Sequence, residues 1–272
     1  MKQPAALWKL RARGLEDARR SIKRGNAEGL HDLRVALRRI CATADALRRH
    51  RVAGRARAIA RSLSRARQLE VDRRLLERVG RLGLLSPDAV TALAARWEKL
   101  AGRAARRLTR ATEGRRMQRL RRRLARLERR GSGNGIKRLA AARRDAESRL
   151  ARSLENKDDK TLHHYRLEVK RARYLADDLV ALGLPEPAGA PREKTLQETL
   201  GRWNDLQIFR RRLAEGREDA EWRGAVALAA ELHRLLAALE PVVAKARAAA
   251  VAASLQRARV VPMRRRAARA RA

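Results

Sequence analysis

The chain has 272 residues, of which 68 are lysine or arginine and 30 are aspartate or glutamate, so its formal net charge at pH 7 is +38. A hydrophobic fraction of 44% is enough to bury a core and excludes a disordered basic tail, and a charge this large favours a polyanionic partner. Aromatic residues make up only 3%, and glycine and proline are sparse outside a few short clusters, so an all-α fold is expected.

Apolar periodicity predicts four helices in the first half of the chain, over residues 4–24, 28–51, 55–83 and 86–130. Gly54 predicts the turn before the third helix. Ser86 and Pro87 begin the fourth, because serine caps a helix and proline is favoured in its first turn. An interruption is expected near Gly114.

The segment 131–135 is rich in glycine and divides the sequence nearly in half. The second half predicts helices over 136–155, 161–183, 192–214 and 217–258, and Pro241 is expected to start a new helix or kink the last one. The expected plan is one domain over 5–258, built from half-repeats 5–130 and 136–258, followed by a basic tail over 259–272. Four helices per half predict two four-helix bundles about a pseudo-twofold axis, with their basic helices facing a common groove.

Two stretches, 31–47 and 163–179, repeat one pattern of side chains. Each has a histidine, an arginine three residues later, bases seven and eight residues later, and an aspartate fourteen residues later. In a helix the histidine, the arginine, the base seven residues later and the aspartate share an arc of about 60°, and the row spans about 21 Å, a length that suits an extended anion. Asp45 and Asp177 close the two rows and are expected to pair with arginines. The apolar positions of both stretches fall on a separate face.

A solvated charged face and an arginine-rich coding bias are the alternatives to a binding site, since a base at any one position is unsurprising in this chain. The histidines favour a site, because two of the five in the chain open the two stretches in the same register.

Together with 62–71 and 196–209, these two stretches resemble the CHAD family, the conserved histidine α-helical domain. The run His-x-x-Arg-x-x-x-Lys-Arg-x-Arg-Tyr from His163 and the run Leu-Gly-x-x-Asn-Asp-Leu from Leu200 are specific in combination. The resemblance covers about 5–258. It implies a pair of four-helix bundles with a basic central cleft that binds inorganic polyphosphate, and an association with polyphosphate granules.

By position, the resemblance implies nine contacts to polyphosphate, which are His31, Arg34, Arg38, Arg39, His163, Arg166, Lys170, Arg171 and Arg173. The chain departs from the family pattern at Cys41, where a base is usual, and at Gln68 and Glu70, where aspartates are frequent. We therefore expect an altered network of acids that orient the arginines, Asp205 among them, with binding retained.

Enzyme signatures are lacking: the sequence has no glycine-rich phosphate loop, no His-Glu-x-x-His pair and no cysteine cluster for zinc. We expect no catalytic residue, no metal and no cofactor. Alternatives to polyphosphate binding are sequence-nonspecific, salt-dependent binding of nucleic acid and a regulatory role beside a phosphate-metabolising enzyme. Aromatic residues occur singly, mostly at core-like positions, which disfavours single-strand binding by base stacking.

The single cysteine, Cys41, excludes an internal disulfide and favours a reducing compartment; a packed thiol is expected rather than a nucleophile. No run of about 18 apolar residues free of charge occurs, so no membrane partner is expected. The expected location is cytoplasmic, at polyphosphate granules.

Overall fold

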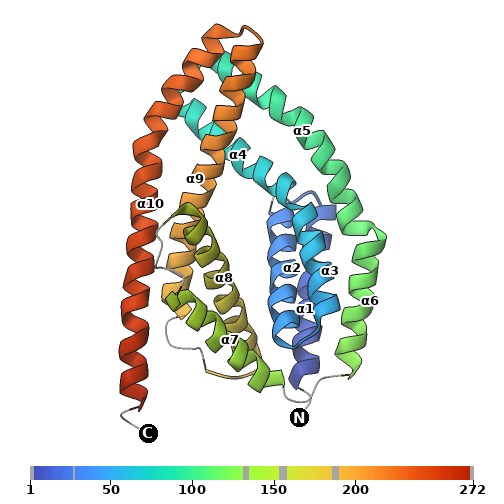
Figure 1. Ribbon diagram of the computed structural model, residues 1–272. Helices are drawn as coiled ribbons and strands as arrows, with labels where there is room; N and C mark the ends of the chain where they lie inside the picture. Colours follow the sequence, from blue (N-terminus) through green and yellow to red (C-terminus); the bar gives the residue numbers. More distant parts are fainter. Residues whose placement is uncertain (1–2, 27, 131–134, 153–157, 186–189, 270–272) are drawn as a thin grey trace. The chain divides into compact units, whose positions relative to one another are not determined.

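The computed structural model describes residues 3–26, 28–130, 135–152, 158–185 and 190–269. Within these ranges the chain folds into α-helices and contains no strand, which confirms the all-α prediction (Figure 1). The helices are α1 (Gln3–Lys23), α2 (Gly29–Ala46), α3 (His50–Ser62), α4 (Ser64–Arg81), α5 (Pro87–Glu113), α6 (Arg115–Arg130), α7 (Gly135–Arg152), α8 (Asp159–Ala181), α9 (Ala190–Trp222) and α10 (Val226–Arg269).

The chain forms two compact units, each of which draws on both halves of the sequence. Unit 1 comprises 1–67, 102–149 and 168–190, and unit 2 comprises 68–101, 150–167 and 191–272. The limits of the units fall inside α4, α5, α7 and α8. The half-repeats, their pseudo-twofold axis and the cleft between them stay predictions. Most of the predicted linker, residues 131–134, lies outside the described residues, and the predicted tail continues α10 as far as Arg269.

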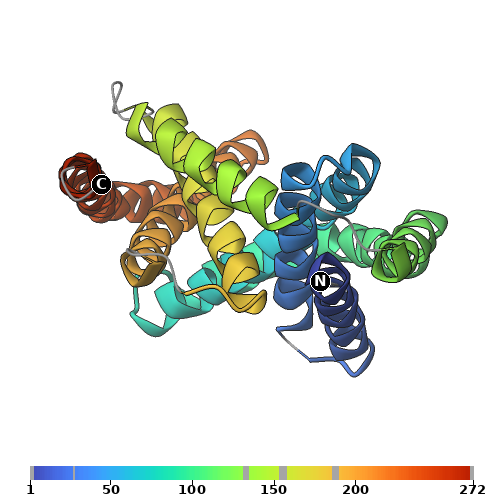
Figure 2. The ribbon, with the colours of Figure 1, turned by 90° about the horizontal axis from the view of Figure 1, so that it is seen from below.

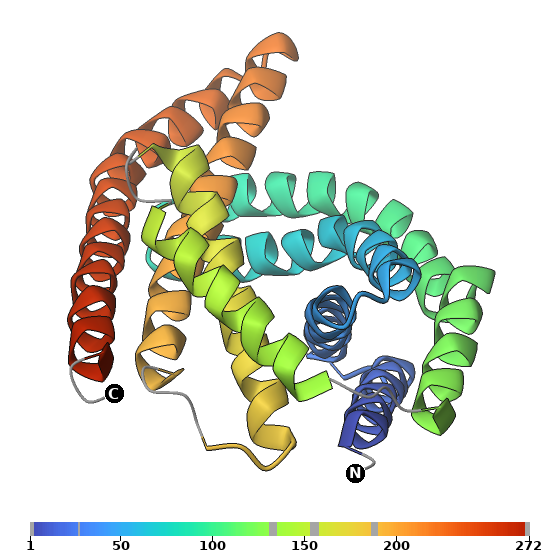
Figure 3. The same ribbon diagram turned by 60° about the horizontal axis from the view of Figure 1, so that its bottom comes forward.

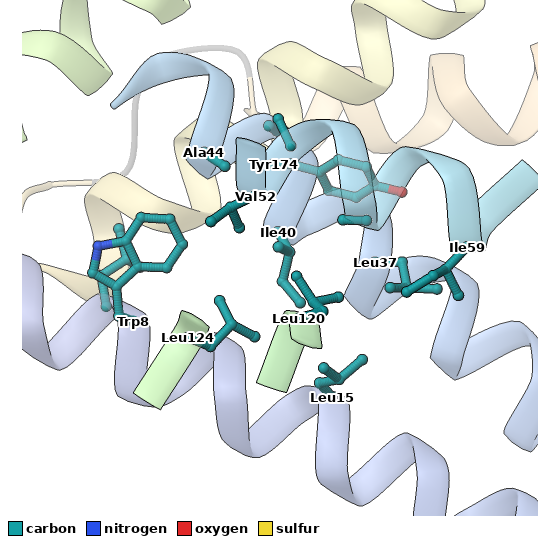
Figure 4. Close-up of a cluster of buried hydrophobic side chains, with 14 of the residues drawn as sticks. Trp8, Leu15, Leu37, Ile40, Ala44, Val52, Ile59, Leu120, Leu124 and Tyr174 are labelled. Carbon is teal, nitrogen blue, oxygen red and sulfur yellow. The ribbon is translucent and has the colours of Figure 1, made fainter. Parts of the chain in front are cut away.

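Unit 1 is built around a ring of four helices. α1 packs against α2 and α6, and α3 packs against the same two helices, so α2 and α6 occupy opposite places in the ring (Figures 2 and 3). All four helices contribute fully buried side chains to one core, among them Trp8, Leu37, Ile59 and Leu120 (Figure 4). The hydrophobic effect of burying this core is the main stabilising contribution to unit 1.

The apolar faces predicted for α2 and α8 are confirmed. Every predicted core position of the two helices is at most 6% exposed. These residues are Leu33, Leu37, Ile40, Ala44 and Leu47 at α2, and Tyr165, Val169, Ala172, Ala176 and Leu179 in α8.

The predicted boundary between the second and third helices was wrong. α2 ends at Ala46, and Gly54 lies within α3 instead of forming a turn. The turn is made by Arg48, which has a φ of 56°, while the amide of Arg49 donates to the carbonyl of Ala44. This is the Schellman motif, in which glycine is the usual residue at the left-handed position. An arginine there carries no sequence signal for a turn.

The predicted third helix, 55–83, is two helices in the structure, with α3 ending at Ser62 and α4 beginning at Ser64. The interruption near Gly114 is confirmed, since α5 ends at Glu113 and α6 begins at Arg115. A Cβ on Gly114 would clash with the carbonyl oxygen of Arg110, so a side chain at this position would force the backbone to shift.

In unit 2, α9 continues past the predicted break near Gly216 as far as Trp222. Gly216 lies inside this helix, where the backbone passes close to Leu93. A Cβ at this position would lie 3.3 Å from the side chain of Leu93. The turn comes instead at Gly224, which has a φ of 71°, and α10 then runs through Pro241 as one helix. The ring of Trp97 packs edge-on against Phe209, with centroids 6.1 Å apart.

Candidate anion-binding site

α2 lies beside the C-terminal half of α8 within unit 1. Nη2 of Arg39 is 2.9 Å from Oδ2 of Asp177, and the hydroxyl of Thr43 donates a 2.6 Å hydrogen bond to Asp178. The guanidinium of Arg39 also lies 5.8 Å from the ring centroid of Tyr174. The first polar row is thereby placed against part of the second.

Seven of the nine predicted contacts therefore belong to one compact unit. We call them the α2/α8 surface, and they are His31, Arg34, Arg38, Arg39, Lys170, Arg171 and Arg173. The other two, His163 and Arg166, lie in the N-terminal half of α8, which belongs to unit 2.

A buried polar cluster anchors α8 to α1 and α2. Arg11 pairs with Asp178, and its Nε donates to the hydroxyl of Thr43 at 3.3 Å. Burial and the nearby positive charge of Arg39 lower the pKa of Arg11 to about 10, so its side chain stays charged at neutral pH. An ion pair this deeply buried fixes the register of the helices that share it. Sequence reasoning missed it, although Arg11 and Asp178 are charged residues in otherwise apolar registers.

Desolvation and charges of both signs set the pKa of His31. Its ring is exposed, yet its pKa lies below the usual value because neighbouring atoms displace part of its hydration and because Arg67 and Lys170 oppose protonation. The carboxylates of Glu28 and Asp32 act in the opposite direction but do not outweigh them. A negatively charged ligand at this point would favour the protonated ring.

Several guanidinium groups of the α2/α8 surface are packed against the protein. The Nε atoms of Arg39, Arg171 and Arg173 are buried and have no hydrogen-bond acceptor among the residues that the structure describes. Arg173 is held over the ring of Tyr174, 5.4 Å from its centroid. Buried donors are normally satisfied, and atoms covered this deeply are closed to a ligand, so these Nε groups are a cost of the packing and not contacts for an anion.

The two aspartates that close the polar rows pair with arginines, as predicted. Asp177 binds Arg39 on the neighbouring helix, and Asp45 binds Arg57 of α3 at 2.6 Å. These carboxylates hold arginine side chains in line.

In unit 2, the ring of His163 contacts the buried amide of Asn204, with 3.2 Å between Nδ1 and Oδ1. Asp205, which we expected to orient an arginine, accepts a 3.4 Å hydrogen bond from Asn204. The arginine contact is made by Asp72, whose Oδ2 lies 2.5 Å from Nε of Arg212. Burial raises the pKa of Asp72 to about 6, although Gln68 and Arg212 lower it.

Cys41 plays no part in the surface. Its thiol donates to the carbonyl oxygen of Ala53 in α3 at 3.2 Å, and burial raises its pKa to about 11. The expectation of a packed, protonated thiol is confirmed.

In the described part of the chain, no cluster of three or more histidine, cysteine or acidic side chains could hold a metal ion. Among the described helices, none combines the length and apolar composition that a membrane span requires. Six of the seven aromatic residues are buried, as expected of most of them, and Trp222, at the end of α9, is 85% exposed.

The family model of the CHAD domain matches residues 5–214 of this chain. A solved structure described as PptA from Streptomyces chartreusis superposes with a TM-score of 0.74 at 20% identity, covering 93% of this chain and 98% of that one. The crystal structure of the CHAD domain from the plant Ricinus communis superposes with a TM-score of 0.69 at 21% identity, covering 92% and 90%. None of the curated proteins matches the sequence.

Proposed function

The chain belongs to the CHAD domain family, and from this we propose that it binds inorganic polyphosphate without catalysing a reaction on it. The observation that carries the proposal is the α2/α8 surface, where the first row of bases lies beside the unit 1 part of the second row on packed helices. Polyphosphate requires fixed cationic donors along its length and no recognition of sequence, and arginine supplies them as forked donors.

The α2/α8 surface is better suited to an anion than a solvated charged face would be. Its arginines are partly buried, and acids such as Asp177 hold them in place. The positive charges of Arg67 and Lys170 oppose protonation of His31. A bound phosphate chain would offset this opposition.

A four-residue variant tests the proposal. Changing Arg34, Arg38, Arg166 and Lys170 to alanine should weaken binding of long-chain polyphosphate by at least about a hundredfold, because several charged hydrogen bonds are lost together. Isothermal titration calorimetry measures the affinity, and circular dichroism checks that helicity is kept.

The matched control changes four exposed arginines outside both polar rows, Arg13, Arg24, Arg51 and Arg78, to alanine. It removes the same charge and should bind within a few-fold of the wild type. Undiminished binding by the first variant would falsify the site assignment. A separate variant with His163→Ala and Arg166→Ala measures how much these two residues of unit 2 contribute to the affinity for polyphosphate.

Nucleic acid is the second candidate partner, because a net charge of +38 attracts any phosphate backbone. Competition separates the two: long-chain polyphosphate should displace duplex DNA at physiological salt, and DNA should displace polyphosphate poorly. A preference in the other direction would favour the nucleic-acid function.

The proposed absence of catalysis and the proposed location have their own tests. Incubation of the pure protein with long-chain polyphosphate and magnesium should release no phosphate. A fluorescent fusion should gather at polyphosphate granules in the cytoplasm, and the four-residue alanine variant should not. Phosphate release, by contrast, would indicate an enzyme or a subunit of one.

A further inference from the structure

α6 carries a second set of cations in unit 1. Its sixteen residues include nine arginines and a single acid, Glu128. Its apolar side chains, among them Met117, Leu120 and Leu124, are buried in the core that α6 shares with α1 and α3. The outer face of α6 is therefore strongly cationic.

Five of these arginines form one stripe along the helix. Their spacings of four and three residues keep them within an arc of about 80° and along about 21 Å of the helix axis. We call this set the α6 stripe; its members, all exposed, are Arg115, Arg119, Arg122, Arg126 and Arg129.

The α6 stripe is electrostatically unfavourable for the helix that carries it. None of its arginines forms an ion pair with another residue that the structure describes, whereas Arg121 beside it pairs with Glu16. Like charges three and four residues apart destabilise a helix, and so do cations such as Arg115 in a first turn that has no acid. A bound polyanion would offset both effects.

The stripe and the α2/α8 surface are separate places on unit 1. α2 and α6 are opposite members of the ring, with α1 and α3 between them (Figures 2 and 3). A phosphate chain that lies along the α2/α8 surface consequently leaves the outer face of α6 open to another chain.

We propose that unit 1 binds polyphosphate at both surfaces and thereby cross-links polyphosphate chains. This inference rests on the proposed function, since the α2/α8 surface is the first of the two sites. Contacts at the stripe are solvent-exposed, so they are weaker and more sensitive to salt than contacts at the partly buried arginines. They become effective because one polymer can engage many copies of the protein.

The chemistry of the stripe favours this ligand over two others. No large apolar side chain of α6 is exposed among the described residues, which disfavours insertion into a lipid surface. The stripe arginines can contact the phosphates of either polymer, but duplex DNA is stiff over about 150 base pairs, so bending it around a small unit costs free energy. A flexible inorganic chain can follow the row.

The test measures bridging directly. Long-chain polyphosphate is fixed to beads, the full chain is loaded onto it, and fluorescent polyphosphate of the same length is then added. The test variant carries Arg→Gln at all five stripe positions, because glutamine is a good helix former. The matched control carries Arg→Gln at five exposed arginines elsewhere, Arg13, Arg24, Arg51, Arg78 and Arg81.

The wild type and the control should load the beads and recruit fluorescent polymer. The stripe variant should load within about twofold of the wild type but recruit about tenfold less, as expected when several phosphate contacts are removed. Sedimentation should give the same oligomeric state for all three proteins.

Equal recruitment by the stripe variant overturns the inference, and so does an equal loss in the control, which would make net charge the cause. Loss of loading by the stripe variant would mean a single site instead of two. Stripe-dependent recruitment of fluorescent duplex DNA, without recruitment of polyphosphate, would assign the stripe to nucleic acid. A wild type that does not load refutes the proposed function itself, whereas loading without recruitment refutes only the cross-linking.

Discussion

α2 and α8 repeat the same polar pattern, yet the fold uses them differently. α2 lies wholly in unit 1, whereas α8 passes from unit 2 into unit 1 between Leu167 and Glu168. His31 faces the cations Arg67 and Lys170, while His163 contacts a neutral amide, that of Asn204. Identical spacing on two helices thus gives two histidines with different neighbours, because residues distant in the sequence decide what each ring meets.

The largest effect is expected where the packing of α2 on α8 is broken. Asp178 is fully buried and Arg11 nearly so, and removal of one partner leaves an uncompensated buried charge. Asp178→Ala should therefore lower the free energy of unfolding by about 3–5 kcal/mol, measured by chemical denaturation. Its neighbour provides the control, since Asp177 and Arg39 are each 36% exposed and Asp177→Ala should cost at most about 1 kcal/mol.

Equal losses in the two variants would contradict the anchoring role of Asp178. If Asp178→Ala does not fold, the double variant Arg11→Met with Asp178→Leu decides the matter. Replacing a buried pair by apolar side chains should restore most of the stability.

Asp72, the buried acid of unit 2, should make the free energy of unfolding depend on pH. The pKa of Asp72 is about 6 in the folded protein and 3.8 for an unperturbed aspartate, so the folded state binds more protons between these values. Stability from this group is present below about pH 4 and is lost as the pH rises through 6. Asp72→Asn removes this loss, and its free energy of unfolding relative to the wild type should rise by about 2–3 kcal/mol from pH 4 to pH 7.

Denaturation at several pH values measures this slope. The unpaired charge left on Arg212 adds a penalty that does not vary over this range, so only the slope is diagnostic. A difference that stays constant with pH would show that the carboxylate of Asp72 titrates normally.

A smaller effect is expected on the pH dependence of polyphosphate binding, to which His31 and His163 should contribute differently. Because desolvation and the cations Arg67 and Lys170 hold the pKa of His31 low and a phosphate chain favours its protonation, polyphosphate should bind more tightly at pH 6 than at pH 8. A rise of one pKa unit on binding corresponds to about tenfold in affinity. His31→Gln should remove more of the pH dependence than His163→Gln, as calorimetry at the two pH values will show. Equal affinity of the wild type at both would exclude protonation of histidine from the binding.

The smallest effect concerns the ends of the two helices. Both close with the same Schellman hydrogen bonds, but the left-handed residue is Arg48 after α2 and Gly183, with a φ of 82°, after α8. Arg48→Gly should stabilise the protein by about 1 kcal/mol, and Gly183→Ala should destabilise it by about as much. Thermal unfolding measures both, and changes of the same sign would contradict the assignment.

The sequence by itself determined the helical class, the buried faces of α2 and α8 and the break at Gly114, because these follow from helix periodicity and from local backbone sterics. It also placed Asp45 and Asp177 where arginines could reach them. Tertiary structure alone decided the rest: the turn at Arg48, the continuity of α9 past Gly216, the anchoring of Asp178 by Arg11 and the division of α8 between two units. The turn at Arg48 is closed by local hydrogen bonds, but an arginine at the left-handed position gives no sequence signal for it. The others involve residues far apart in the chain, and local patterns of side chains do not show which distant groups will meet.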